Sequence, residues 1–317
     1  MNLVHGSNLE QKESHKTKYR DRESRAYLAE IRLEYNKWRD ANMRLSGPSS
    51  KIQKDDAAVV RERARLLENY KNFLDQQKYA EKFDSRSNLH STVLEEFLFY
   101  LFKDLVADFG EKALVGKSHT FKDIFFLPPN YSAMLARPHA SVERKDHDFV
   151  IGATVEARLF ITDDRQSRAD AENPGSVGIF EAPASYETRI EGRVERHYFD
   201  LPAVVIECKT YLDKTMLEGS SRAAEELKAR NPNGLYLVVM EWLKLTEDVN
   251  LRKYKVDQIY VFRKQKNTDR EFRFDVDYVK NPINLDVVFH LFNLVRDHLT
   301  ADWEGGIKYG LERGWLI

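Results

Sequence analysis

The most informative segment of this chain is Ala203-Val204-Val205-Ile206-Glu207-Cys208-Lys209. Its four consecutive apolar residues predict a short β-strand that is buried on both faces. Because side chains alternate along a strand, Glu207 and Lys209 should point to the same side. Burial of a charge is costly unless the charge is paired or binds a metal ion. The pair is therefore either a structural ion pair at the mouth of the sheet or part of a site that needs a second carboxylate.

A second apolar strand upstream supplies that carboxylate. It is expected in Lys145-Asp146-His147-Asp148-Phe149-Val150-Ile151-Gly152, where Asp146 and Asp148 share a face by the same period of two. Residues 153–161 and 189–198 also have β character, so a long hairpin would carry Asp148 beside Glu207. Asp, Glu and Lys at adjacent strand ends suit Mg²⁺, which binds one or two carboxylates, several waters and phosphate oxygens.

Asp148 with Glu207-Cys208-Lys209 resembles the PD-(D/E)XK nuclease signature. The ordered set of Leu89-His90-Ser91-Thr92-Val93-Leu94-Glu95-Glu96-Phe97, then residues 145–149, then residues 206–216 resembles Type II restriction endonucleases. It is most similar to the BbvCI-like group, which cuts CCTNAGC-type sites, and the resemblance spans about residues 85–262. His147 stands where the motif has Pro, so Asp146 remains a rival to Asp148 as the first acid.

The resemblance implies an α/β protein with a mixed sheet and a restriction-endonuclease-like core. It implies Mg²⁺ bound by Asp148, Glu207 and the backbone carbonyl of Cys208, with Lys209 beside the phosphate. The expected reaction is hydrolysis of double-stranded DNA to 5′-phosphate ends. A double-strand cut by one site per chain implies a dimer, formed with a second copy or with a different subunit.

Residues 88–108 predict a helix with one apolar face, and two acids lie on it. Glu95 lies at the edge of that face, whereas Glu96 lies nearly opposite. Glu95 also follows Thr92 by three residues, as in a capping box. Glu95 is therefore either a helix cap or, as in nucleases that the chain resembles, a third carboxylate that supports the metal site from the helix beside the sheet.

Composition limits the remaining possibilities. The chain has 317 residues, 42% apolar and 32% charged, with a net charge of −1, so it is not broadly basic. A single cysteine, Cys208, excludes an intrachain disulfide and, with scattered histidines, makes a zinc site implausible. No bilayer-length apolar run and no apolar signal core occur, so we expect a cytoplasmic protein without a membrane partner. Walker-type and G-x-G-x-x-G phosphate loops are absent from the sequence.

The expected domains are an N-terminal helical region over 1–85 and a nuclease domain over 86–317. Residues 9–45 and a second helix from Asp55 or Asp56 to about Asp84 predict a helical hairpin around the break at 45–50. Its basic clusters are either solvated faces or phosphate contacts. They are Arg20, Arg22, Arg25, Arg61, Arg63 and Arg65.

The nuclease domain should contain a long polar insertion at about 162–188, which is functional or disordered. The arginines in and around it are candidates for base or phosphate contact: Arg165, Arg168, Arg189, Arg193 and Arg196. After Lys209 the pattern predicts a helix over 213–230, strands over 235–240 and 256–263, and a helix over 284–299. Two rivals remain: a repair or junction nuclease of the same fold, and a non-catalytic DNA-binding or assembly module.

Overall fold

The computed structural model describes residues 3–83, 89–136, 140–162, 192–303 and 311–312. It contains a five-stranded sheet with the strand order β1-β2-β3-β4-β5 and an additional pairing of β1 with β3. Strands β3, β4 and β5 run parallel to one another. The strand bounds are β1 Ala113–Phe126, β2 Ala140–Thr162, β3 Gly192–Leu212, β4 Leu235–Leu243 and β5 Gln258–Val261.

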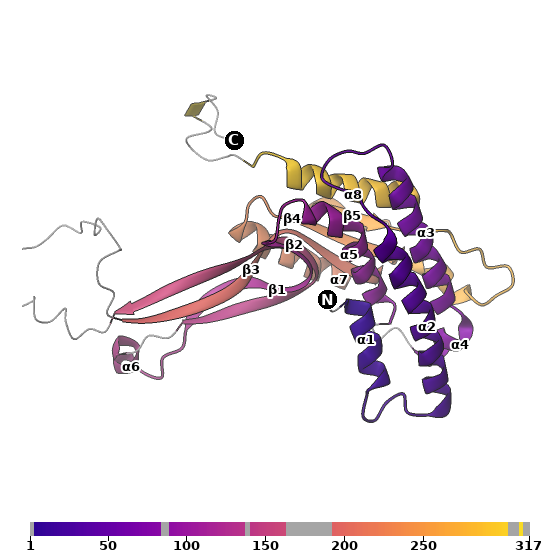
Figure 1. Cartoon of the computed structure of the whole chain (residues 1–317), viewed down its shortest axis with the longest axis horizontal. Coiled ribbons are helices and arrows are strands. Elements are labelled where there is room, and N and C mark those ends of the chain that lie inside the picture. The colour runs from indigo at the N-terminus through magenta and orange to yellow at the C-terminus, as the bar shows by residue number, and fades with distance from the viewer. Residues whose placement is uncertain (1–2, 84–88, 137–139, 163–191, 304–310, 313–317) are drawn as a thin grey trace, which may run out of the picture. The chain divides into compact units, whose positions relative to one another are not determined.

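Helices surround the sheet, and most of them were expected from apolar periodicity (Figure 1). They are α1 Val4–Glu13, α2 Arg22–Arg44, α3 Asp56–Leu74, α4 Gln77–Lys82, α5 Ser91–Ala107, α6 Tyr131–Ala136, α7 Lys214–Arg230 and α8 Leu285–Thr300. Two short 3-10 helices follow β4 and β5, η2 Leu251–Lys253 and η3 Asn267–Phe272.

The central strands are covered on both faces, as their continuous apolar sequence requires. On one face, Val204, Ile206 and Cys208 of β3 pack in a large core with helices α1, α2, α3, α5 and α8. On the other face, Val205 packs in a second core, which α7 covers. Alternate residues of a single strand thus enter different cores. The predicted α/β class with a mixed sheet is confirmed.

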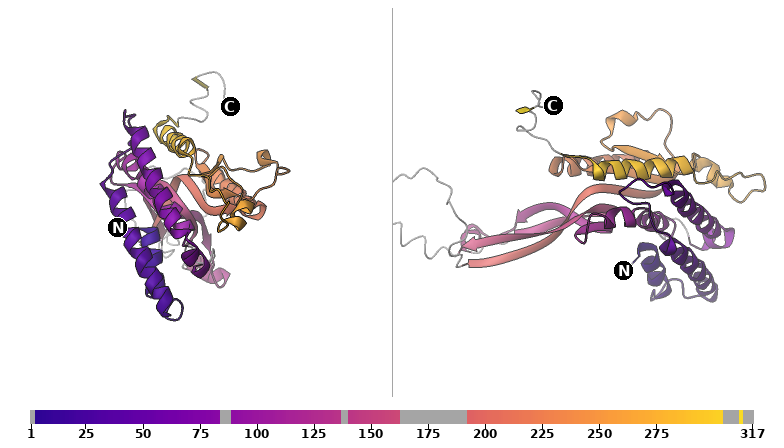
Figure 2. Two further views of the ribbon diagram at one scale, coloured as in Figure 1. Left: turned by 90° about the vertical axis from the view of Figure 1, so that its right-hand side faces the viewer. Right: turned by 45° about the horizontal axis from the view of Figure 1, so that its top comes forward.

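Strands β2 and β3 form the predicted long hairpin (Figures 1 and 2). The backbone N–H of Cys208 donates to Asp148 Oδ2 at 2.9 Å, and the Thr154 hydroxyl donates to Asp200 Oδ1 at 2.6 Å. Between these two contacts the residue number increases along β2, from 148 to 154, and decreases along β3, from 208 to 200. The two strands are therefore antiparallel. The predicted insertion at 162–188 lies, apart from Thr162, outside the described residues.

Strand β1 was not predicted, because residues 110–144 carry no clear alternation. Its residues are mostly half-buried or exposed, and Ser118 and Thr120 are the buried ones. Polar residues on a strand of this kind hide the period-two pattern on which a sequence prediction depends.

The N-terminal prediction needs two corrections. Residues 9–45 are not one helix, because residues 14–21 separate α1 from α2 and Tyr19 has a positive φ of 61°. Asp21 then caps α2 by accepting a hydrogen bond from the Ser24 N–H at 2.9 Å. The second helix ends at Leu74 rather than near residue 84, and a separate α4 follows. Asp55 is the N-cap residue of α3 but makes no side-chain capping bond.

Helices α2 and α3 pack against each other, as the hairpin prediction requires, and Arg63 joins them at the turn. The Arg63 side chain is fully buried and donates to the carbonyl oxygens of Asn42, Leu45 and Gly47 at 2.8–3.3 Å. Neither sequence interpretation of this residue is correct, because a fully buried guanidinium is neither a solvated face nor a phosphate contact.

The chain divides into two compact units. One contains Met1–Ser118, Asp146–Ala153 and Pro202–Ile317, and in it helices α1–α3 share the core of α5, α8 and the sheet. The other contains His119–Lys145 and Thr154–Leu201, where the rings of Phe121 and Phe199 lie 4.7 Å apart. A domain boundary near residue 85 stays a prediction. Among the described helices, none has both the length and the apolarity needed to cross a membrane.

Candidate active site

The site begins where the buried part of β3 reaches its first charged residues. Val204, Val205 and Ile206 are fully buried, and Glu207 and Lys209 pair in register with Val238 and Met240 of the parallel strand β4. The central position of β3, between β2 and β4, leaves the two charged side chains only partly exposed, 15% for Glu207 and 28% for Lys209. Charges held this far from water need partners.

Lys209 links the two predicted carboxylates. Its Nζ donates to Glu207 Oε2 at 2.8 Å and to Asp148 Oδ2 at 3.0 Å. Asp148 also accepts the Cys208 backbone N–H from the neighbouring strand. The hairpin therefore brings together the three residues Asp148, Glu207 and Lys209, which lie far apart in sequence. Asp146, the rival acid, is exposed.

The second oxygen of Glu207 is held by two residues that sequence analysis did not identify. The hydroxyl of Tyr236, on β4, donates to Glu207 Oε1 at 2.9 Å. Nδ1 of the buried His147 lies 3.5 Å from the same oxygen, and its ring packs edge-on against Tyr236 at 6.1 Å. His147 was noted only as a departure from the motif, and Tyr236 only as part of an apolar strand.

His147 and Asp148 are consecutive, yet both reach the Glu207–Lys209 pair. Regular alternation would send them to opposite faces. A sequence prediction based on that alternation groups Asp146 with Asp148 and separates His147 from them. The local geometry of β2 instead brings His147 into contact with Glu207.

These contacts fix the charge states of the pair. Burial acts to raise the pKa of Glu207, but the contact with His147 and the positive charge of Lys209 outweigh it and hold that pKa well below its ordinary value. Burial acts to lower the pKa of Lys209, but the charges of Asp148 and Glu207 raise it above its ordinary value. At neutral pH Glu207 is therefore ionised and Lys209 is protonated.

Glu95 approaches the site from α5 and differs from the other acids. It is 5% exposed, and its Oε2 has no hydrogen-bond partner among the described residues. Lys117 Nζ lies 3.9 Å from that oxygen. Burial, and then the charge of Asp148, raise the pKa of Glu95 to about 7. Helix α5 begins with His90 as its N-cap, which makes no side-chain capping bond, so the capping-box interpretation of Glu95 is wrong.

Glu96 is buried as well, but both of its carboxylate oxygens accept hydrogen bonds from neighbouring groups of the fold. Its Oε2 accepts the backbone N–H groups of His5 and Gly6 at 2.9 and 3.1 Å, and its Oε1 accepts the Tyr100 hydroxyl at 2.6 Å. These bonds hold the first turn of α1 against α5. The sequence placed Glu96 opposite the apolar face because it could not show that α1 covers that side.

The donor set fits a hard divalent cation. Asp148 and Glu207 are adjacent carboxylates, and Glu95 contributes a buried oxygen without a hydrogen bond. Mg²⁺ needs only one or two protein carboxylates, because waters and phosphate oxygens complete its coordination. The described residues contain no group of three or more His, Cys, Asp or Glu arranged as a metal cluster. Cys208 is a buried free cysteine, and burial raises the pKa of its thiol well above the ordinary value.

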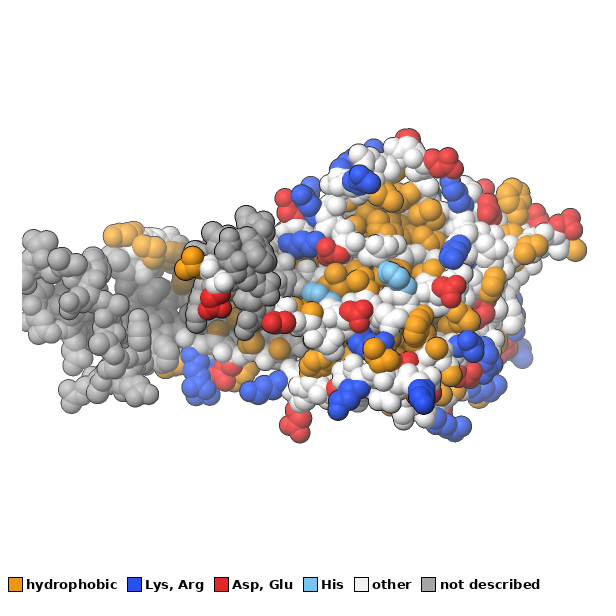
Figure 3. Space-filling view, turned by 90° about the horizontal axis from the view of Figure 1, so that it is seen from above, with side chains coloured by type: hydrophobic (Ala, Val, Ile, Leu, Met, Phe, Trp, Pro, Cys, Tyr) orange, Lys and Arg blue, Asp and Glu red, His pale blue; other side chains and the backbone are white. Residues whose placement is uncertain are grey.

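The structure describes few of the remaining candidate arginines. Arg165, Arg168 and Arg189 lie outside the described residues, and the side chain of Arg193 is also outside them. Arg196 is largely exposed and lies 3.8 Å from Glu156. On the face drawn in Figure 3, basic and acidic side chains are interspersed and form no continuous basic field.

Comparison with known proteins supports the nuclease interpretation of this geometry. The family model described as Bpu10I restriction endonuclease matches residues 86–173 and 179–316. The chain is also similar to a solved structure described as the native BbvCI A2B2 tetramer at low resolution. The TM-score is 0.62 and the identity 19%, over 95% of this chain and 98% of that chain, which shows a shared fold. No curated protein matches the chain.

The family match covers more than half of the chain and includes every residue of the candidate site, from Glu95 on α5 to Tyr236 on β4. The restriction-endonuclease resemblance predicted from the sequence is confirmed. The protein is thus a Type II site-specific deoxyribonuclease, and it belongs to the Bpu10I restriction endonuclease family.

Proposed function

We propose that this enzyme hydrolyses phosphodiester bonds of double-stranded DNA with Mg²⁺ held by Asp148 and Glu207, and that it leaves 5′-phosphate and 3′-hydroxyl ends. The observation that carries the proposal is the position of the Lys209 Nζ, within hydrogen-bonding distance of both carboxylates. Such a constellation supports a cation site at the two carboxylates, with the ammonium group of Lys209 beside it and within reach of the same phosphate.

When bound, the ion would lower the pKa of a coordinated water and offset the negative charge that builds up on the phosphate. Lys209 stays protonated and donates hydrogen bonds, either to a phosphate oxygen or to the attacking water. Tyr236 donates to Oε1 of Glu207 and His147 lies beside that oxygen, while Oε2 accepts from Lys209 and would be the oxygen available to an ion. The carbonyl of Cys208 remains a further candidate ligand by resemblance alone.

Glu95 is proposed as a supporting carboxylate. Because it is buried and its pKa is about 7, Glu95 is partly protonated at neutral pH when no metal ion is bound. A divalent cation close to Asp148 and Glu207 would favour the ionised form. Glu95 would then add a third negative charge from the α5 side that helps to hold the ion.

Asp148 rather than Asp146 is proposed as the first metal carboxylate. Asp148 is tied to both Lys209 and the β3 backbone, whereas Asp146 is exposed at the same strand. Family membership supports restriction over a repair or junction nuclease and over a non-catalytic module. The similar solved structure is an A2B2 tetramer, which supports an oligomer with a second copy or a second subunit.

The test compares Asp148→Asn with Asp146→Asn on a long, sequence-diverse DNA that wild type cuts into discrete fragments. With Mg²⁺, Asp148→Asn should lose cleavage by at least a hundredfold, and Asp146→Asn should stay within a few-fold of wild type. The wild-type fragments should be rejoined by DNA ligase without prior phosphorylation. Cleavage by Asp148→Asn but not by Asp146→Asn would overturn the assignment of the first acid, and unligatable ends would overturn the end chemistry.

A further inference from the structure

A cluster of cations lines two neighbouring cavities at the C-terminal ends of β3 and β4, separate from the catalytic residues. The larger cavity, about 260 Å³, is lined by His90, Tyr211, Asn267, Arg270, Glu271 and Arg273, among others. The smaller, about 170 Å³, shares Arg270 and Arg273 and adds Asp75, Trp242, Tyr278 and Lys280. Two arginines thus border both spaces.

Several polar atoms that line these cavities lack a hydrogen bond within the described part of the chain. Trp242 is 1% exposed, and its Nε1–H is a buried donor without an acceptor. Nε of Arg270 and Nε of Arg273 are unpartnered as well. A buried N–H without an acceptor is unfavourable. Asn267 Oδ1 and the Tyr278 hydroxyl, which also line the cavities, lack partners among the described residues as well, but three of the five unpartnered atoms are N–H donors that only an acceptor can satisfy.

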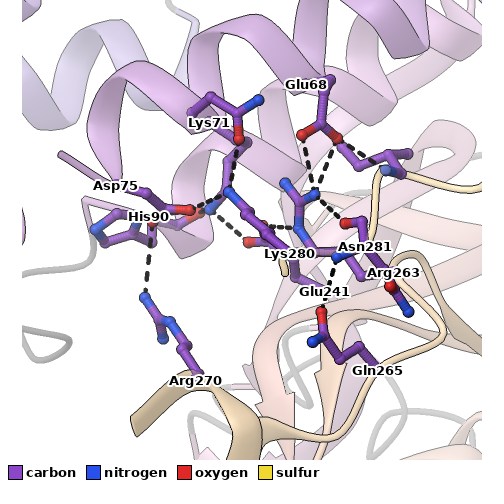
Figure 4. A network of polar contacts seen from close by, with 12 residues as sticks. Glu68, Lys71, Asp75, His90, Glu241, Arg263, Gln265, Arg270, Lys280 and Asn281 are labelled. Atoms are coloured by element: carbon purple, nitrogen blue, oxygen red, sulfur yellow. Dashed lines mark hydrogen bonds and ion pairs between the residues drawn. The ribbon is translucent and has the colours of Figure 1, made fainter. Parts of the chain in front are cut away.

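Among the side chains that line the two cavities, the cations outnumber the acids. Deeper in the core, Glu241 pairs with Lys71 and Arg263 at 2.7 Å each, and Glu68 pairs with Arg263 at 2.9 Å (Figure 4). These four charges offset one another. Lys280 and Asp75, at the smaller cavity, also interact electrostatically with Glu241 of this group.

At the smaller cavity, the half-buried Asp75 is shared between two cations. Its carboxylate pairs with Lys280 at 2.5 Å and lies 3.8 Å from Arg270, which Figure 4 shows extending towards it. Arg273 is a further cation at both cavities, and the exposed Glu271 is the acid that lines the larger cavity. His90 is held neutral, because burial and the charge of Lys71 lower its pKa to about 3.

Arg270 and Arg273 also repel each other. Burial, and then the positive charge of Arg270, lower the pKa of Arg273. Its Nη1 donates only to the carbonyl of Arg270 at 3.3 Å, so no carboxylate is hydrogen-bonded to this guanidinium within the described chain. An anion between the two arginines would relieve the repulsion and supply the missing acceptor.

Strand β3 and helix α5 each contribute a residue to the catalytic site and a residue to the larger cavity. Tyr211, at the larger cavity, follows Lys209 by two residues on β3, which is roughly 7 Å along a strand. His90, also at that cavity, precedes Glu95 by one and a half turns at the start of α5. A DNA strand with one phosphate at Lys209 would therefore have neighbouring phosphates within reach of the cavities.

We propose that Arg270 and Arg273 form an accessory phosphate-binding pocket, which takes a backbone phosphate of the DNA strand near the one being cut. The same chemistry would bind free inorganic phosphate, and the experiment must distinguish these sources. The inference rests on the proposed function in placing a DNA phosphate at Lys209, but not on the identity of the metal ligands, since it concerns DNA binding rather than the cleavage step.

Arg273→Gln is the test variant, because within the described part of the chain Arg273 has no ion pair whose loss would disturb the fold. DNA binding is measured in a chelator, without cleavage, over a range of salt concentrations. Wild type, Arg273→Gln and Arg252→Gln, an exposed arginine on η2, are compared. In parallel, the shift in melting temperature produced by inorganic phosphate is measured for each protein without DNA.

Arg273→Gln should weaken DNA binding about tenfold and lower the slope of log K against log salt by about one. It should also lose the phosphate-dependent rise in melting temperature, while Arg252→Gln keeps it. A lost phosphate response with unchanged DNA affinity would overturn the DNA assignment in favour of a free-anion site. No phosphate response in wild type and an unchanged salt slope would overturn the pocket itself. Arg273→Lys, which keeps the charge, should retain most of the binding if Arg273→Gln proves unstable.

Discussion

The hydroxyl of Tyr236 donates a 2.9 Å hydrogen bond to Oε1 of Glu207, across the parallel pair of β4 and β3. This bond fixes the plane of a carboxylate whose other oxygen contacts Lys209. Partners of this kind orient a metal-binding group without touching the metal, and their loss costs activity without removing a ligand.

Tyr236→Phe should reduce the cleavage rate by about 10–100-fold and raise the Mg²⁺ concentration needed for half-maximal rate. The fold should survive, because the ring remains in the core. Steady-state cleavage of a plasmid at increasing Mg²⁺ measures both effects. Tyr254→Phe is the matched control, since the Tyr254 hydroxyl is buried without a hydrogen-bond partner among the described residues. An unaltered Mg²⁺ dependence in Tyr236→Phe would exclude the positioning role.

Glu95 should make stability depend on pH in metal-free buffer. Its folded-state pKa of about 7 lies above the ordinary 4.5, so the folded protein holds the proton more tightly than the unfolded chain. The stability from the protonated carboxyl is fully present below about pH 4.5 and is lost as pH rises through about 7. Glu95→Gln removes this titration.

Relative to Glu95→Gln, wild type should therefore lose about 3 kcal/mol between roughly pH 5 and pH 8. Urea unfolding of both proteins in a chelator, at several pH values, measures the difference. The exposed Glu218→Gln should follow the wild-type profile. Parallel pH profiles for wild type and Glu95→Gln would show that Glu95 ionises normally.

The strands around Glu207 and Asp148 could be predicted from the sequence because strands that are buried on both faces consist of continuous apolar runs. The sequence also predicted their antiparallel pairing, and the structure brings Lys209 against both acids. It missed Tyr236 and His147 because their roles arise from cross-strand contacts that no spacing along one strand encodes. It also misjudged Glu96, since only the tertiary packing of α1 buries that side of α5.

Arg63 shows the same limit for charged residues. Its neighbours Arg61 and Arg65 are exposed, yet Arg63 is fully buried in the turn between α2 and α3. A helix face that looks uniformly basic in sequence thus contains one structural arginine. Its partners are backbone carbonyls of residues 42–47, which a pattern of side chains does not reveal.

Arg63→Ala should destabilise the protein by roughly 3–5 kcal/mol, because three buried carbonyl oxygens lose their donors and a cavity forms. Arg61→Ala, on the exposed face, should change stability by less than about 0.5 kcal/mol. Chemical denaturation of both variants provides the comparison. If Arg63→Ala is as stable as Arg61→Ala but binds DNA more weakly, the residue acts on DNA and the structural role is wrong.

The central claim is that Asp148, Glu207 and Lys209 form one metal-dependent site for DNA cleavage. It is tested most directly by digestion of a long, sequence-diverse DNA with wild type and Lys209→Ala, with and without Mg²⁺. The account predicts discrete fragments with wild type and Mg²⁺, none without Mg²⁺, and none with Lys209→Ala despite a normal melting profile. Cleavage by Lys209→Ala at the wild-type rate would contradict it, and so would wild-type cleavage that persists in a chelator.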